Sequence, residues 1–154
     1  MDTPHEQQVN GVKRILQNAS SSLVNYLEET TLTMLIEEDI KADKEKYQAV
    51  LSSIRRLSVH VEESIDLCER LSRTAYLSEA AKNKAFKKLY VHCVEAFYNP
   101  KNDAWQENSR ASYSNKMGVE FDQPVAGSLI ELMKKISPDF DQLREELEIY
   151  EHQY

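Results

Sequence analysis

The strongest constraint on the fold is a stretch of about thirty residues, 43–74, that contains neither proline nor glycine. Apolar residues recur along it at three- and four-residue steps, the spacing of one face of an α-helix. These apolar residues are Tyr47, Val50, Ile54, Leu57, Val61, Ile65, Cys68 and Leu71. Asp43 is a suitable N-cap for such a helix. The pattern predicts a helix about 45 Å long, at 1.5 Å per residue, that forms the spine of the domain.

Comparable patterns predict helices on either side of this spine. Residues 5–29 form one apolar stripe, and Thr30-Thr31 interrupts it because β-branched hydroxyl residues favour helix caps. Residues 32–40 then form a short second helix, or the first helix continued after a bend. Ser78 is a suitable N-cap for the helix after the spine. That helix ends at Asn99-Pro100, because proline disfavours helix at the residue before it.

The C-terminal part of the chain predicts two more helices. Apolar positions mark residues 125–136 and again residues 140–150. Between them, Ser137-Pro138-Asp139 fits the N-cap, the first-turn proline and the acidic first turn of a last helix. Together these segments predict an all-α, largely antiparallel bundle of four to five helices, with residues 1–154 in one helical domain.

One long segment lacks the helical pattern. Residues 99–124, NPKNDAWQENSRASYSNKMGVEFDQP, hold the only tryptophan, two of the four prolines and one of the three glycines. A connection of more than about 12–15 residues without helix or sheet is uncommon, and it is usually functional or disordered. Residues 111–114 and 119–121 flank a turn-like Asn115–Gly118, which predicts a small β-hairpin. This segment is therefore the first place to look for function.

Composition limits the functional classes. The net charge is −7, which does not favour binding to nucleic acid or to an anionic membrane. The N-terminus lacks a basic region followed by an apolar stretch, and no apolar stretch is long enough to span a bilayer. We therefore expect a cytoplasmic protein. Residues 70–101 carry a net charge of +5 and residues 120–154 carry −6. These regions are either solvated faces or, for the basic region, an anion- or partner-binding corner.

Two further patterns concern cysteine and histidine. In a hairpin that turns near Tyr76, Cys68 and Cys93 are offset by about 13 Å along the helix axis, too far for a disulfide. We expect both to be reduced core thiols. His60-x-x-Glu63 and His92-x-x-Glu95 lie at the same level of this hairpin, as in some metal sites of helical bundles. A helical wheel places these side chains on solvated flanks, so no metal site is predicted, and no cofactor motif is present.

The candidate site residues all lie in the non-helical segment. They are Lys101, Asp103, Trp105, Arg110 and Tyr113. In a structural interpretation, Trp105 pins the segment to the bundle and Arg110 pairs with a nearby carboxylate. In a functional interpretation, the segment is a recognition surface, since Trp, Tyr and Arg are enriched at interface hot spots.

A resemblance to a known family covers the same region. The sequence from Leu89-Tyr90-Val91-His92-Cys93 through residues 99–113 is similar to a stretch of the YpuI-like proteins of bacilli and their relatives. The closing residues 143–150 are similar as well. The function of that family is not known, so the resemblance implies a cytoplasmic bacterial protein. It supplies no activity, cofactor or catalytic residue.

Two functional hypotheses follow. The first is a non-enzymatic interaction or regulatory module that presents residues 99–124 to a protein partner or to a second copy of the chain. The alternative is a protein that binds a small anionic ligand, such as a nucleotide or phosphorylated metabolite. Arg110 and Lys101 would then clamp the charge, while Trp105 or Tyr113 would stack on the ligand. This alternative predicts a pocket under the segment. Catalysis stays open but is not favoured.

Overall fold

The computed structural model describes residues 4–39, 43–74, 76–101, 104–108, 118–122 and 124–151. The predicted all-α, largely antiparallel bundle is confirmed. The described elements are α1 (Pro4–Glu29), α2 (Leu32–Glu38), α3 (Lys44–Ser72), α4 (Glu79–Leu89), the π-helix η1 (Tyr90–Glu95), α5 (Ala96–Tyr98), β1 (Gln106–Glu107), β2 (Val119–Glu120) and α7 (Gly127–Glu151).

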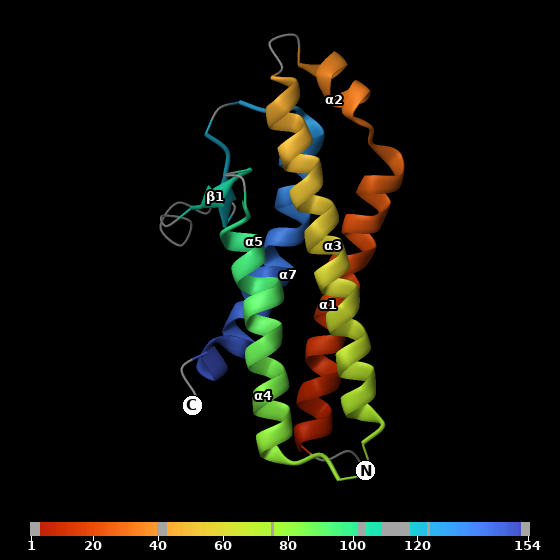
Figure 1. Cartoon of the computed structure of the whole chain (residues 1–154), viewed down its shortest axis with the longest axis vertical. Helices are drawn as coiled ribbons and strands as arrows, with labels where there is room; N and C mark the ends of the chain where they lie inside the picture. The colour runs from red at the N-terminus through yellow and green to blue at the C-terminus, as the bar shows by residue number, and fades with distance from the viewer. Residues whose placement is uncertain are drawn as a thin grey trace.

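The bundle has an up-down-up-down arrangement (Figure 1). The helix α1 rises from the N-terminal end, α3 returns beside it, the continuous rod α4–η1–α5 rises again, and α7 descends. The helix α1 packs against both α3 and α7, while η1 packs against α7 and α3. Each rod therefore buries an apolar stripe against its neighbours. None of the described helices combines the length and the apolar character needed to cross a membrane.

The helix starts follow the predicted caps. The Asp43 carboxylate accepts a hydrogen bond from the backbone N–H of Glu45 at 3.0 Å. The Ser78 hydroxyl accepts one from the N–H of Ala81 at 3.1 Å. Thr31 caps α2 in the same way, so the short second helix is a separate element. A side-chain oxygen at the N-cap satisfies a backbone donor that the helix itself cannot pair.

The prediction of two helices in the C-terminal part was wrong. The helix α7 continues through Pro138, although proline there removes one backbone hydrogen bond and crowds the preceding turn. Ile136 and Phe140, on either side of this position, are both fully buried. Burial of this continuous apolar stripe outweighs the local cost of the proline, so the helix is not broken.

The rod after Ser78 contains a π-helix that the sequence pattern did not predict. Residues Tyr90–Glu95 make i→i+5 hydrogen bonds, so the turn is wider than in an α-helix. Within this turn the adjacent residues Cys93 and Val94 are both buried. The wider turn thus lets one short segment of the rod face α3 and α7 together. Single π turns inside helices often occur at functional sites.

Part of the predicted β-hairpin is confirmed. The strand β2 lies where it was expected, but its partner is β1, with Gln106 opposite Glu120 and Glu107 opposite Val119. Residues 111–114, the predicted first strand, lie outside the described residues. The strand β1 follows Trp105 directly in the sequence. Because Trp105 is fixed to the bundle, the backbone of β1 is held beside β2.

Tyr47 links three elements of the bundle at the end where α2 meets α3. Its buried hydroxyl donates to the Asp39 carboxylate at 2.9 Å and accepts from the backbone N–H of Ala126 at 2.8 Å. Burial raises the pKa of Tyr47, so the hydroxyl stays protonated and can act as both donor and acceptor. These hydrogen bonds therefore tie the residue before α7 to α3 and to the end of α2.

We predict that Tyr47→Phe lowers the free energy of unfolding by about 1–3 kcal/mol, because the buried N–H of Ala126 loses its acceptor. Urea unfolding measures the change. Tyr76→Phe is the matched control, since Tyr76 is 94% exposed and should change stability very little. Equal stability of the two variants would contradict the assigned role of Tyr47.

Candidate functional site

Trp105 anchors the non-helical segment to the bundle. Its side chain is only 2% exposed, and its indole Nε1 donates to the backbone carbonyl of Phe97 at 2.6 Å. The ring also makes an edge-on contact with Phe121, with 6.3 Å between ring centres. These contacts support the structural interpretation of Trp105. Of the other candidate residues, Lys101 is exposed, whereas Asp103, Arg110 and Tyr113 lie outside the described residues.

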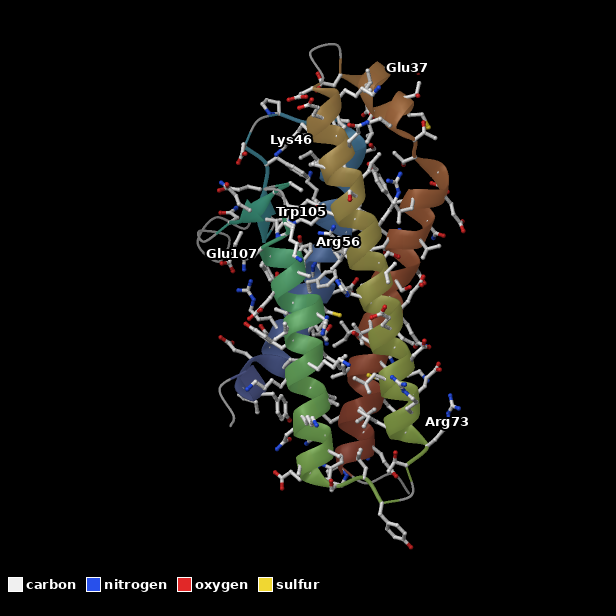
Figure 2. The ribbon with its side chains drawn as sticks, viewed as in Figure 1. Glu37, Lys46, Arg56, Arg73, Trp105 and Glu107 are labelled. Atoms are coloured by element: carbon white, nitrogen blue, oxygen red, sulfur yellow. The ribbon has the colours of Figure 1, made fainter. Side chains whose placement is uncertain are left out.

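A cleft opens where this segment leaves the rod. It lies between α3 and the η1–α5 part of the rod and has a volume of about 610 Å³. Figure 2 shows Arg56 on the side of α3 that faces α5. The Ser53 hydroxyl on α3 donates to the carbonyl of Lys101 at 3.3 Å, which fixes the backbone of Lys101 at the rim. Cations from two elements therefore line one cleft.

The far wall of the cleft is an ordered polar and aromatic network. The Arg144 guanidinium lies 3.4 Å from the ring centre of Tyr98 and forms a 2.6 Å ion pair with Glu107. The Tyr98 hydroxyl donates to Asp141. Burial, and then the contact with Asp141, raises the pKa of Tyr98, so this hydroxyl is protonated at neutral pH. Arg144 is therefore held in the wall by its contacts with Tyr98 and Glu107.

Gly118 lets β2 approach this wall closely. A Cβ atom at this position would lie 3.1 Å from the Tyr98 ring and 3.3 Å from the Asp141 carboxylate, tighter than normal contact. The Gly118 carbonyl also accepts a hydrogen bond from Asn108 at 2.8 Å. Glycine at this position thus holds the small β-sheet against the wall of the cleft.

The prediction that His60 and His92 are solvated flank residues was wrong. Both are half-buried, and their ring centres lie 5.3 Å apart with the ring planes tilted by 49°. Both residues lie about 100° from the centre of an apolar face. On neighbouring antiparallel helices, however, such flanks meet across the groove, as they do in coiled coils. The equal distance of the two histidines from the turn was the sequence signal for this contact.

Burial lowers the pKa of His60, and the neighbouring His92 lowers it further, while Glu63 acts in the opposite direction. The His60 Nδ1 atom is buried, and no described residue forms a hydrogen bond with it. His60 is therefore a mainly neutral imidazole at neutral pH. Nothing in the described parts of the chain fixes its tautomer.

The charged residues that line the cleft balance one another. Arg56, Lys101 and Arg144 supply three cations, and three carboxylates complete the lining. These carboxylates belong to Glu95, Glu107 and Glu148. A second hollow of about 250 Å³ adjoins the first, and both are lined by His60 and His92. The histidine pair thus lies between two hollows of one groove.

No metal centre is formed by the residues that the structure places. Within these ranges, no three His, Cys, Asp or Glu side chains are grouped closely enough to hold a metal ion. His60 and His92 are two imidazoles without a third ligand of these types among the described residues.

The two cysteines are buried free thiols, as predicted. The Cys93 thiol lies 3.1 Å from the Ser64 hydroxyl and forms a longer contact with the His60 carbonyl at 3.7 Å. Burial raises the pKa of both Cys68 and Cys93 to about 12. Neither thiol is ionised at neutral pH, so neither is a nucleophile for the cleft.

We predict that neither thiol of the folded protein reacts with Ellman's reagent near pH 8, whereas both react at once in denaturant. Absorbance of the released thiolate measures the reaction. An N-acetylcysteine standard controls for reagent activity. Rapid modification of one thiol in the folded protein would show that its site is more open than the structure indicates.

The comparisons with known proteins identify the family of the chain. Residues 9–154 match the model of a family described as "Protein of unknown function (DUF3907)", and the chain belongs to this family. A relative from Bacillus subtilis (strain 168), the uncharacterized protein YpuI, is 39% identical over 127 residues. The alignment covers 82% of this chain and 70% of the relative. No solved structure matches.

The family therefore confirms the resemblance seen in the sequence but assigns no role to any residue. The sequence placed the candidate site at residues 101–113, and of the two predicted site residues that the structure describes, Lys101 lines the cleft and Trp105 does not. Arg56, His60 and His92 join it from helices whose apolar patterns gave no indication of a site. All three residues lie beside the buried apolar stripe of their own helix, at the edge where the two neighbouring rods meet.

Proposed function

We propose that this protein binds a small anionic molecule in the cleft between α3 and the rod. The carrying observation is that Arg56 and Lys101 line this cleft without an ion pair to any described residue. Arg144, by contrast, is held by Glu107. Two cations that line one cavity and form no ion pair with a described residue give an anion two points of attachment.

The size and lining of the cleft support a ligand of metabolite or nucleotide size. Small-molecule sites generally have volumes of about 300–1,000 Å³ and combine apolar walls with a few polar groups. Here Val91, Ala96 and Pro100 supply apolar surface, and Tyr90 supplies an aromatic side chain. A phosphorylated small molecule with a ring matches this combination.

The same observations favour ligand binding over a recognition surface built on Trp105. A hot-spot residue must be accessible to its partner, whereas the Trp105 side chain is in the core. A binding role is also favoured over catalysis, because the buried Cys93 thiol is protonated and unsuited to attack. We place this binding protein in the cytoplasm, where free thiols are maintained.

A thermal-shift assay tests the proposal. We expect nucleoside phosphates or sugar phosphates to raise the melting temperature of the wild-type protein. A ligand at 100 times its dissociation constant contributes about 2.7 kcal/mol, or roughly 5 °C or more for a protein of this size. Arg56→Ala and Lys101→Ala should each remove most of the shift, because each loses a charge-assisted contact.

Arg73→Ala is the matched control. Arg73 is the C-cap of α3, at the end far from the cleft, where it pairs with Glu69 and points away from the bundle (Figure 2). This variant should keep the full ligand-induced shift. Absence of a shift across the panel, or a shift that Arg56→Ala leaves intact, would overturn the proposal.

A further inference from the structure

The histidine pair is the part of the groove whose charge can change near neutral pH. An imidazole ordinarily titrates at about pH 6.5, whereas Arg, Lys and the carboxylates keep their charge between about pH 5.5 and 8. His60 and His92 come from different rods and lie at the junction of the two hollows. Their protonation therefore alters both hollows together.

The fixed charges around the pair cancel in each hollow. The larger hollow has three cations and three carboxylates. The smaller hollow has two of each, with Glu63 and Asp66 on α3, Arg70 further along α3, and Lys88 on α4. With neutral histidines the formal charge of the lining is zero, and with both protonated it is +2. The histidine pair thus decides whether the groove as a whole attracts an anion.

Glu63 favours the protonated form of His60, but the described residues do not hold the ring by a hydrogen bond at its buried nitrogen. The buried Nδ1 of His60 has no hydrogen-bond partner in the parts of the chain that the structure describes. Histidines with a purely structural role are usually held by a carbonyl or carboxylate, since an unpaired buried nitrogen costs stability. The ring itself is only half-buried, so an anion in the groove would accept from its accessible edge, and the unpaired Nδ1 has no described partner that holds the ring in one tautomer.

We propose that His60 and His92 form the anion-recognition element of this groove, and that the groove takes up protons together with a ligand that carries a phosphate or sulfate ester. This inference rests on the proposed function and names its ligand class. Two imidazolium rings with centres 5.3 Å apart can donate to different oxygens of one tetrahedral group. Arg56 or Lys101 then pairs with a remaining oxygen.

The pH dependence has a defined sign. In the free protein, burial and His92 lower the pKa of His60, so protonation is unfavourable near pH 7. A bound anion favours the charged imidazoles and raises their pKa values. Proton uptake therefore accompanies binding, and affinity increases as the pH falls from about 8 to about 6. Each proton taken up tightens binding by up to about tenfold per pH unit between the free and bound pKa values.

NMR titration of the histidine side chains tests this inference directly. The probe is phenyl sulfate, which keeps one negative charge over the whole pH range. In the wild-type protein, phenyl sulfate should raise the pKa values of His60 and His92 while leaving His5 unchanged. Its affinity should increase at least about tenfold between pH 8 and pH 6, which requires uptake of at least about half a proton per ligand on average.

Variants separate this role from simple folding effects. His60→Gln and His92→Gln should each reduce the pH dependence to roughly the square root of the wild-type factor, about threefold where the wild type shows tenfold, because only one imidazole is left to take up a proton. His5→Gln, on α1 and outside the groove, is the matched control. If either groove variant fails to fold, the pKa values measured in the wild-type protein still decide the question.

The possible results distinguish the two proposals. Binding of phenyl sulfate without a change in either histidine pKa would overturn the role of the pair and leave the anion-binding function intact. No binding between pH 5.5 and pH 8, or binding that Arg56→Ala does not weaken, would overturn both. Zinc binding to the wild-type protein with loss in His60→Gln, in the absence of any anion effect, would instead make the pair a metal ligand set.

Discussion

Burial of the apolar face of α3 is the interaction on which the rest of the structure depends. This helix contacts α1 along its length, and its other side meets η1. Val50, Ile54, Leu57 and Val61 are at most 2% exposed, so one stripe of α3 fills the centre of the bundle. Because apolar burial is the dominant favourable term in folding, the positions of the other rods follow from this stripe.

The cleft is a consequence of the same packing. Residues next to the buried stripe of α3, such as Arg56 and His60, lie at the edge of the helix–helix contact and face the rod. The rod presents His92 and Tyr98 to the same groove, with a π turn between α4 and α5. The cleft is therefore lined mainly by helical residues, which hold side chains more precisely than loops do, while Lys101 and Glu107 of the long segment complete it.

The sequence was sufficient for most of the fold, because the repeat of apolar residues and the caps at Thr31, Asp43 and Ser78 are local signals. It was insufficient where tertiary packing overrides local preference. Pro138 would end an isolated helix, yet α7 continues through it. The partner of β2 and the contact between His60 and His92 depend on which surfaces meet in space. A wheel drawn for one helix cannot contain that information. Lys101 was predicted as a site residue because it is a basic residue of the non-helical segment, whereas Arg56 was not among the candidates.

The anchoring of Trp105 has an optical consequence. Trp105 is the only tryptophan of the chain. The fluorescence at wavelengths longer than those of tyrosine therefore comes from one ring, at the point where the long segment is fixed to α5. A ring in the core emits at shorter wavelength than one in water. The native protein thus carries a built-in fluorophore that distinguishes detachment of this segment from melting of the bundle, which helical circular dichroism follows separately.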